Sequence, residues 1–303
     1  MAFARLQEKI NELKNPTVVG LDPDLAHIPP DILDKYIKEY GETLEAASIA
    51  VVEFNAGLID ALYDIVPAVK PQSAFYEALG PYGVIALSKT CDYAKSKGMY
   101  VILDGKRNDI GTTAAAYSAA YLGMTKVGSA EIAPFNADAL TVNAYLGSDG
   151  IKPFIENAVK YDKAMFALVK TSNPSAGELQ DKMVGDDRVY TLVGDLMEEI
   201  SKDTIDKFGY TCVGAVVGAT YPEELEFLRK RLKNTFFLVP GYGAQGGSAA
   251  EAALAFDEKG HGAVVNSSRG IIAAWKKHGG DYATAARNEA IIMRDEFRKV
   301  LKF

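Results

Sequence analysis

Eight short and mostly apolar runs recur along the chain, and they constrain its fold more than any other feature. Each run is almost continuously hydrophobic, a pattern typical of strands that are covered on both faces. Every gap between two runs is long enough for a helix that crosses back over the sheet. We therefore expect parallel strands at residues 17–22, 66–70, 100–104, 139–143, 164–170, 211–217, 236–240 and 262–266.

Amphipathic stretches follow the apolar runs and complete eight strand-helix units. No change of composition marks a linker, so we expect a single domain over residues 1–303. Eight such units favour an α/β fold, the (β/α)8 TIM barrel, and an open Rossmann-like sheet is the alternative. The helices are expected at residues 42–64, 83–97, 112–122, 150–160, 189–207, 222–232, 248–258 and 281–300.

Three further segments lie outside these predicted strands and helices. Residues 1–15 carry an apolar stripe of helical period, which predicts a helix that closes one end of the core. Residues 171–188 are rich in Gly, Pro, Asp and Ser, so we expect a surface loop there. Within it, residues 173–187 are either a lid or an idle insertion. Residues 23–41 contain prolines that act as breakers, and we assign them no function.

Composition narrows the class of protein. With 48% hydrophobic and 24% charged residues, the chain is not disordered. A formal net charge of −7 gives no general attraction to nucleic acid or to an anionic membrane, so the expected partner is a small molecule. Cys91 and Cys212 form no CxxC motif, no run approaches the roughly 18 apolar residues of a membrane span, and the N-terminal segment lacks a signal peptide's apolar region. These features predict a cytoplasmic protein.

Polar side chains follow seven of the eight predicted strands at their carboxyl ends. In a parallel barrel these ends meet at one face, where the loops converge and active sites lie. Any one of them could be a satisfied polar cap, but so many on one face predict a functional site. The residues are Asp22, Lys70, Asp104, Lys106, Asn143, Thr171, Ser172, Gln245 and Arg269.

The segment YVILDGKRNDIGTT, residues 100–113, contains the most informative motif. Residues two apart on a strand face the same way, so Asp104 and Lys106 are expected to point into the barrel mouth together. Asp109 falls where the next helix starts. The structural alternative is a salt bridge between Asp104 and Lys106, with Asp109 as a helix cap. Lys70 on the adjacent strand instead favours an electrostatic device.

A glycine-rich segment, VPGYGAQGG at residues 239–247, precedes an expected helix. Backbone N–H groups at such a helix start favour an anion, and Arg269 after the eighth strand adds a positive charge. Together they predict the phosphate site that barrels build from their last two loops, although a tight connection alone would also explain the glycines. The dispersed His27, His261 and His278 predict no metal site, and the chain has no Walker pattern.

The motif DGKRNDIGTT resembles the Asp-x-Lys-x-x-Asp-Ile-x-x-Thr signature of the orotidine 5′-phosphate decarboxylase family. The resemblance spans residues 17–270, because other residues occur in the family's order at predicted strand ends. The segments VKPQSAFYE and VNAYLGSDG are similar to the family's longer subgroup. The chain departs from the family where Ser268, rather than glycine, precedes Arg269. The residues in family order are Asp22 in GLDPD, Lys70, Ser172 in KTSNPS, Gln245 in PGYGAQGG, and Arg269.

The resemblance implies decarboxylation of orotidine 5′-monophosphate to uridine 5′-monophosphate and CO2 without a cofactor or metal, the last step of de novo pyrimidine nucleotide synthesis. It makes Lys106 the proton donor to C6 of the pyrimidine and Asp104 the carboxylate that faces the departing CO2. Lys70 would complete the charged array and, with Asp22, contact the ribose hydroxyls.

The resemblance also implies roles for residues beyond the array. Ser172 would contact the pyrimidine, and Gln245 and Arg269 would hold the phosphate. Asp109 and Thr113 would reach across an interface into the partner's site. The expected assembly is therefore a homodimer whose active sites are shared between subunits.

Two alternatives remain open on the sequence. Ketogulonate-phosphate decarboxylases and hexulose-phosphate synthases resemble the same Asp-x-Lys-x-x-Asp strand, and they need Mg2+. A noncatalytic barrel would bind uridine monophosphate through the same phosphate site and never consume the orotate nucleotide.

Overall fold

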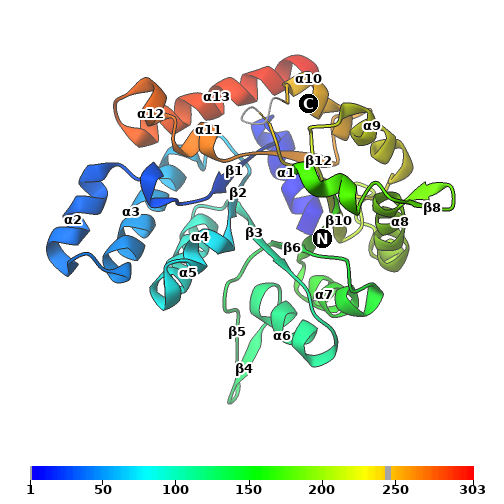
Figure 1. Cartoon of the computed structure of the whole chain (residues 1–303), viewed down its shortest axis with the longest axis horizontal. Helices are drawn as coiled ribbons and strands as arrows, with labels where there is room; N and C mark the ends of the chain where they lie inside the picture. The colour runs from blue at the N-terminus through cyan, green and yellow to red at the C-terminus, as the bar shows by residue number, and fades with distance from the viewer. Residues whose placement is uncertain (1, 243–246) are drawn as a thin grey trace.

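Eight parallel strands form a closed barrel in the computed structural model, which describes residues 2–242 and 247–303 (Figure 1). Around the barrel the strands follow the order β1-β12-β11-β10-β7-β6-β3-β2. Each strand overlaps one of the predicted apolar runs, which confirms the (β/α)8 barrel over the Rossmann-like sheet. The strands are β1 (Thr17–Leu21), β2 (Ala68–Pro71), β3 (Tyr100–Arg107), β6 (Ala139–Val142), β7 (Ala164–Lys170), β10 (Val213–Val217), β11 (Phe237–Val239) and β12 (Ala263–Ser267).

Helices connect successive strands and surround the barrel (Figure 1). Side-chain caps fix several of their starts: the Thr43 hydroxyl accepts a hydrogen bond from the Ala46 N–H at the start of α3, and Asp281 accepts one from the Thr284 N–H at the start of α13. The longer connecting helices are α3 (Leu44–Leu62), α5 (Gly80–Ser96), α6 (Gly111–Tyr121), α7 (Ser148–Tyr161), α8 (Val189–Ser201), α9 (Pro222–Arg231) and α13 (Tyr282–Val300). The shorter elements are α4 (Ser73–Glu77), α10 (Ala249–Ala252), α11 (Arg269–Ile272), α12 (Trp275–His278), η1 (Leu25–His27), η2 (Pro174–Glu178), η3 (Lys202–Thr204) and η4 (Ala253–Ala255).

The apolar residues divide between the inside of the barrel and the layer between strands and helices. Alternation along each strand produces this division, since Val18 and Ile102 pack inside the barrel while their neighbours Val19 and Val101 face the helices. Burial of one such side chain stabilises the fold by about 1.5–3 kcal/mol.

Helix α1 (Ala2–Leu13) closes the end of the barrel where the strands begin. Its apolar stripe includes the fully buried Leu6 and Ile10. The ring of Phe3 stacks on Phe236 with centroids 4.8 Å apart. Its centroid also lies 4.9 Å from that of Phe166, which points into the barrel. This end is therefore filled with side chains, which leaves the opposite end for a site.

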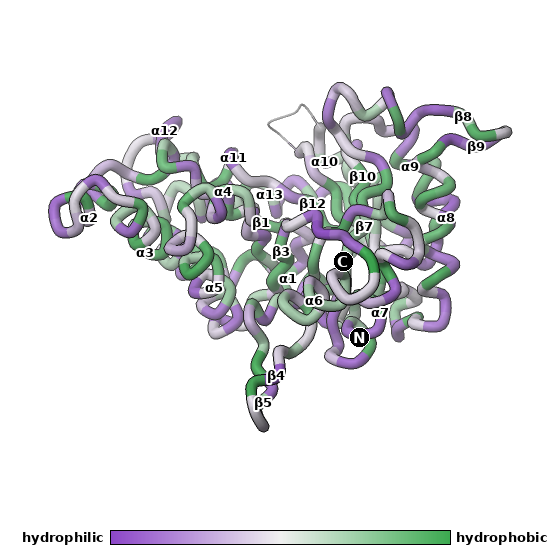
Figure 2. Tube along the Cα trace, turned by 60° about the horizontal axis from the view of Figure 1, so that its bottom comes forward, coloured by the Kyte–Doolittle hydropathy of each residue, from purple (hydrophilic) through white to green (hydrophobic). Residues whose placement is uncertain are grey.

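The connections contain elements that the sequence did not predict. The segment 23–41 holds helix α2 (Pro30–Tyr40), because Pro30 occupies the first helical position, where proline is favourable rather than disruptive. Strands β4 (Thr125–Val127) and β5 (Ala130–Ile132) form an antiparallel hairpin that projects away from the barrel (Figures 1 and 2). Two further short strands, β8 (Met183–Val184) and β9 (Asp187–Arg188), pair inside the loop after β7.

Candidate active site

The carboxyl end of β3 leaves the regular strand geometry just where the charged motif begins. Between Leu103 and Arg107 the register of β3 against β6 shifts, so the backbone bulges there. Lys106 has a φ of 47°, in the left-handed region, and its N–H donates to the Thr141 hydroxyl over 2.9 Å. Strand alternation correctly predicted that Asp104 and Lys106 point the same way, but it assumed a regular strand. The bulge, and not a straight strand, sets the lysine backbone.

Asp104 lies at the centre of a compact array of polar groups. One carboxylate oxygen accepts a hydrogen bond from Lys70 Nζ at 2.7 Å, and the other accepts one from Lys106 Nζ at 2.7 Å. Two residues that sequence reasoning missed complete the array. Gln72 Nε2 donates to the first oxygen and the Thr141 hydroxyl to the second, each at 2.8 Å. Their signal was weak, because a Gln after a strand and a Thr within an apolar strand are common.

The array carries more positive than negative charge, and its members stabilise one another in their ionised forms. Burial opposes ionisation of Asp104, but Lys70 and Lys106 outweigh it and hold the pKa of that carboxyl well below its usual range. Burial likewise opposes the charge of Lys70, yet Asp104 and Asp22 raise the pKa of its ammonium above the ordinary value. The Lys106 side chain is 47% exposed, whereas Lys70 and Asp104 are buried. Lys106 is thus the cation that an incoming molecule meets.

A cavity of about 460 Å³ opens directly over the array, within the range typical of small-molecule sites. The three charged residues line one side of it. Leu168, Val216 and Leu238, from three successive strands, supply an apolar surface. The cavity therefore suits a ligand that is flat and apolar in one part and charged in another. Its other lining residues are Thr141, Thr171, Ser172, Asn173, Gln180 and Pro240.

A second cavity, of about 430 Å³, adjoins the first and shares Lys70 and Pro240 with it. Asp22 and Arg269 line this second cavity. One Asp22 carboxylate oxygen is buried without a hydrogen-bond partner in the described part of the chain, so it is free to accept one from a ligand. Arg269 is exposed and forms no ion pair with any residue that the structure describes. Gln245, the other predicted phosphate ligand, lies outside the described residues.

Asp109 and Thr113 do not join the array within one subunit. Asp109 is half-buried in the loop before α6, and its carboxylate accepts a hydrogen bond from the neighbouring Ile110 N–H. Thr113 lies exposed in the first turn of α6. Asn143, another polar residue at a strand end, accepts a hydrogen bond from the Tyr145 N–H and shapes a local turn. The structure thus brings Asp22, Lys70, Asp104, Lys106, Thr171, Ser172 and Arg269 to two adjoining cavities, whereas Asp109, Thr113 and Asn143 do not line either cavity.

Among residues 2–242 and 247–303, no three His, Cys, Asp or Glu side chains gather in a way that could hold a metal ion. Within the same residues, no helix has both the length and the apolar character needed to cross a membrane.

Comparison with known proteins gives one consistent result. Residues 26–279 match the sequence profile of the orotidine 5′-phosphate decarboxylase / HUMPS family. The chain is 45% identical over 287 residues to orotidine 5′-phosphate decarboxylase of Rhodopirellula baltica, covering 94% of this chain and 92% of that protein. It is 42% identical over 274 residues to the enzyme of the same name from Caldicellulosiruptor bescii, covering 90% of each. Among solved structures, Leishmania donovani OMP decarboxylase superimposes with a TM-score of 0.72 at 31% identity, covering 97% of this chain and 98% of that one.

Proposed function

The chain belongs to the orotidine 5′-phosphate decarboxylase / HUMPS family, and from that premise we propose that the array of Lys70, Asp104 and Lys106 performs its reaction. The protein is a carboxy-lyase that converts orotidine 5′-monophosphate to uridine 5′-monophosphate and CO2, the last step of de novo pyrimidine nucleotide synthesis. One observation carries the assignment of residues. Two ammonium groups contact the two oxygens of a single carboxylate at the floor of a ligand-sized cavity.

Lys106 is the group that replaces CO2 with a proton. When the bond from C6 to the carboxylate breaks, its electron pair stays on C6 in the plane of the pyrimidine, where no π system delocalises it. A fixed ammonium beside C6 lowers the energy of that developing charge and then transfers a proton to it. The released Lys106 amine recovers its proton from water. The partial exposure of Lys106 in the cavity supports this role, because the ammonium can reach a bound ligand.

Asp104 holds the two ammonium groups in place and faces the substrate carboxylate. Its lowered pKa keeps it ionised wherever the enzyme works, so it repels the carboxylate and favours its departure as CO2. The same negative charge keeps Lys70 and Lys106 protonated before the substrate arrives. Hydrogen bonds from Gln72 and Thr141 fix the Asp104 carboxylate in advance, so the array does not have to reorganise during the reaction.

The second cavity receives the ribose 5′-phosphate end of the substrate. Asp22 and Lys70 bind ribose hydroxyls, and Arg269 and Gln245 bind the phosphate, while Ser172 contacts the pyrimidine in the first cavity. Among the described residues, Arg269 has no ion-pair partner and one Asp22 oxygen has no hydrogen-bond partner, and both observations support this division. Phosphate binding far from C6 contributes to catalysis when it stabilises the closed position of the 173–187 segment as a lid.

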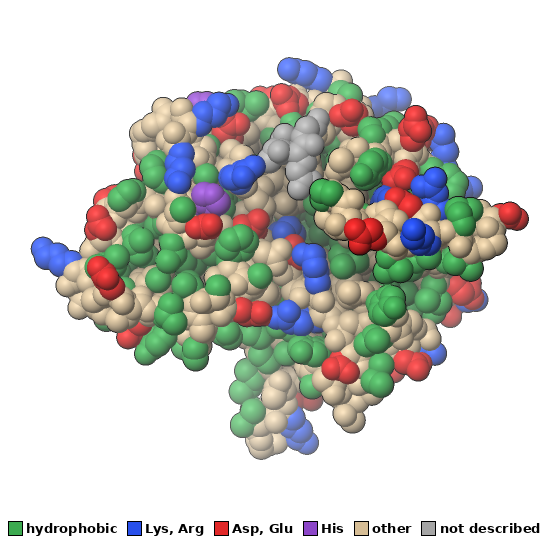
Figure 3. Space-filling model, viewed as in Figure 1, with side chains coloured by type: hydrophobic (Ala, Val, Ile, Leu, Met, Phe, Trp, Pro, Cys, Tyr) green, Lys and Arg blue, Asp and Glu red, His purple; other side chains and the backbone are tan. Residues whose placement is uncertain are grey.

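We also propose a homodimer in which Asp109 and Thr113 enter the partner's site. Both residues lie near the N-terminus of α6, outside their own subunit's array. The adjoining surface carries large apolar side chains that are half exposed or more, and Figure 3 shows such side chains on the projecting hairpin. A second copy would bury them. They are Ile110, Val127, Ile132, Tyr145 and Leu146.

Complementation tests the shared site. Lys106→Ala and Asp109→Ala chains, each inactive alone, should recover part of the activity when they are co-expressed. One of the two sites in a mixed dimer would then contain neither substitution. No recovery, or a monomer in sedimentation, would contradict the homodimer.

We propose that the protein is cytoplasmic, because the state of its two cysteines fits a reducing compartment. Cys91 and Cys212 are both buried free thiols, as expected in a reducing compartment.

Ultraviolet absorbance of orotidine 5′-monophosphate, followed with and without a chelator, tests the function itself. We expect the same consumption of substrate in both conditions. Activity lost on adding chelator would instead favour a Mg2+-dependent sugar-phosphate enzyme of the same barrel type. Binding of uridine monophosphate with no consumption of the orotate nucleotide would indicate a noncatalytic barrel.

A further inference from the structure

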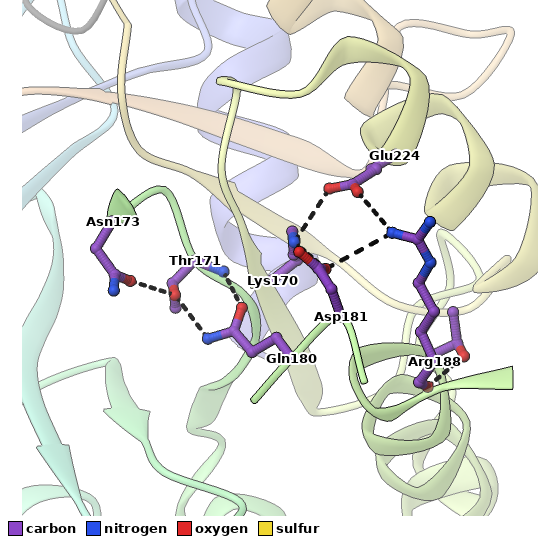
Figure 4. Close-up of polar contacts among 8 residues, drawn as sticks. Lys170, Thr171, Asn173, Gln180, Asp181, Arg188 and Glu224 are labelled. Atoms are coloured by element: carbon purple, nitrogen blue, oxygen red, sulfur yellow. Dashed lines mark hydrogen bonds and ion pairs between the residues drawn. The ribbon is translucent and has the colours of Figure 1, made fainter. Parts of the chain in front are cut away.

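A second charged cluster lies beside the active site, around Lys170 at the end of β7 (Figure 4). The register of β7 against β10 shifts there, with Leu168 opposite Val216 but Lys170 opposite Val217. Leu168 and Val216 pack inside the barrel, whereas Val217 faces the helices. The bulge therefore turns Lys170 outward, away from the cavity that its neighbours line.

Lys170 is almost completely buried, at 2% exposure, and its ammonium is fully engaged. It forms ion pairs with Asp181 in the loop after β7 and with Glu224 of α9, the latter at 3.3 Å. The rings of Tyr190 and Tyr221 lie 5.1 Å from its nitrogen, in cation–π contact. Three of these four partners belong to the helices or to their first turns. Asp181 alone ties the loop to the lysine.

Gln180, the residue before Asp181, faces the other way. Its side-chain oxygen accepts the Thr171 N–H at 2.9 Å, and its side-chain nitrogen donates to the Thr171 hydroxyl at 2.7 Å. Figure 4 shows this pair of bonds beside the ion pairs of Lys170. Gln180 also lines the first cavity, together with Lys106 and Ser172. It thus connects the loop to the backbone that carries the predicted pyrimidine contact.

We propose that the ion pair between Lys170 and Asp181 is a latch that holds the loop docked before substrate arrives, and that Gln180 is a positioning residue that fixes Thr171 and Ser172 at the cavity. The chain order supports the coupling. Gln180 and Asp181 are adjacent on the loop, and Lys170 and Thr171 are adjacent at the end of the strand. Asp181 binds Lys170 and Gln180 binds Thr171, so the two interactions lie side by side. An ordered loop leaves less conformational entropy for the substrate to remove on binding.

The latch is separable from the stability of the barrel, which makes it testable. Without Asp181, Lys170 keeps Glu224 and both tyrosine rings, so its charge is not left unpaired. The loop, however, loses its tie to the buried lysine. Asp186 offers a matched control, because it is an exposed aspartate of the same loop without an ion pair to any described residue.

The experiment compares Asp181→Ala with Asp186→Ala, and it rests on the proposed function for its kinetic measurement. If the docked fraction of the loop falls to about a tenth, KM for orotidine 5′-monophosphate rises about tenfold. We expect that rise in Asp181→Ala, with kcat within about twofold of wild type because the bound state is still reached. Asp186→Ala should leave both constants unchanged. Gln180→Ala should raise KM in the same way although the latch is intact.

Trypsin cleavage at Lys182 and Arg188 provides a readout that does not depend on turnover. Cleavage should be faster in Asp181→Ala than in wild type or Asp186→Ala, and saturating uridine monophosphate should slow it. Equal KM values and equal cleavage in the two aspartate variants would overturn the proposal. A wild-type protein that fails to consume orotidine 5′-monophosphate would instead refute the proposed function, and the cleavage rates would still test the latch.

Discussion

Two charged clusters at the carboxyl ends of the strands have mirrored composition. Around Asp104, one carboxylate lies between the ammonium groups of Lys70 and Lys106. Around Lys170, one ammonium lies between the carboxylates of Asp181 and Glu224. Both clusters sit at β-bulges, which turn one lysine into the barrel mouth and the other out toward the helices. A β-bulge therefore places a lysine at the cavity in one cluster and a lysine in the layer between strands and helices in the other.

What separates the clusters is the charge that each leaves available. Lys106 remains 47% exposed beside a cavity, so a positive charge is free to meet an anionic substrate. Lys170 is 2% exposed and surrounded by partners, so it has no charge to offer. A reactive array keeps one member incompletely satisfied, whereas a structural one satisfies every member. This contrast predicts that substitution of Lys106 mainly changes the rate of the reaction, whereas substitution of Lys170 mainly changes the stability of the fold.

The largest expected effect is on turnover in Lys106→Ala. Loss of the proton donor and of the charge beside C6 should lower kcat by at least about 10³-fold. Binding of uridine monophosphate should persist, because its phosphate and ribose contacts lie in the second cavity. Stopped absorbance assays and equilibrium titration measure the two quantities. Lys152→Ala, an exposed lysine of α7, controls for loss of charge alone. Substantial residual turnover would remove Lys106 from the mechanism.

The sequence predicted the barrel and the inward-facing array because both follow from periodicity. The apolar runs mark the strands, and Asp104, Lys106 and Lys70 follow from the fact that parallel strand ends share a face. The bulges leave no mark in the sequence. Lys170 ends the apolar run AMFALVK like any polar residue at a strand end, and only the register against β10 shows that it points outward.

Other parts of the site depended on contacts between residues distant in sequence. Gln72, Thr141 and Gln180 look ordinary in isolation, and each acquires a role from a partner on another segment. Asp109 and Thr113 could be assigned only through the family resemblance, since a single chain leaves them outside the array. Helix α2 was missed because proline was taken as a breaker where it starts a helix.

The second prediction concerns stability in Lys170→Met. The methionine fills similar space, but Asp181 and Glu224 then face each other without the cation between them. Breaking a fully buried pair costs about 3–5 kcal/mol, and partial exposure of both carboxylates reduces this to about 1–3 kcal/mol of unfolding free energy. Denaturant titration measures it, with Lys202→Met, whose ion pair is exposed, as the matched control. A loss no larger than that control's would show that Lys170 is not a structural centre.

The third prediction is that the two clusters lose their stabilising effect at opposite ends of the pH scale. Asp104 has a lowered pKa in the folded state, so its contribution is complete above the unfolded value of about 3.9 and is lost as the pH falls below it. For Lys170, burial opposes the charge, but Asp181 and Glu224 raise the pKa. Its contribution is therefore complete below about pH 10.4 and is lost as the pH rises further.

Unfolding free energies of variants across pH isolate these two effects. The difference between wild type and Asp104→Asn should shrink below about pH 4, and the difference between wild type and Lys170→Met should shrink above about pH 10.4. Each change is at most about 1.4 kcal/mol per pH unit, because one proton is involved. A difference that stays constant in its expected window would contradict the assigned charge state of that cluster.

The smallest expected effect comes from Arg188→Gln at the rim of the second cluster. Arg188 lies 3.3 Å from Glu224 and 3.8 Å from Asp181, and its side chain is 45% exposed, so water and salt screen both ion pairs. We expect a loss of about 0–1 kcal/mol in unfolding free energy and a KM for orotidine 5′-monophosphate equal to that of wild type. Denaturant titration and steady-state kinetics check the two values. A KM increase like that of Asp181→Ala would mean that Arg188 is part of the latch, and that the latch is not limited to the buried ion pair of Lys170 with Asp181.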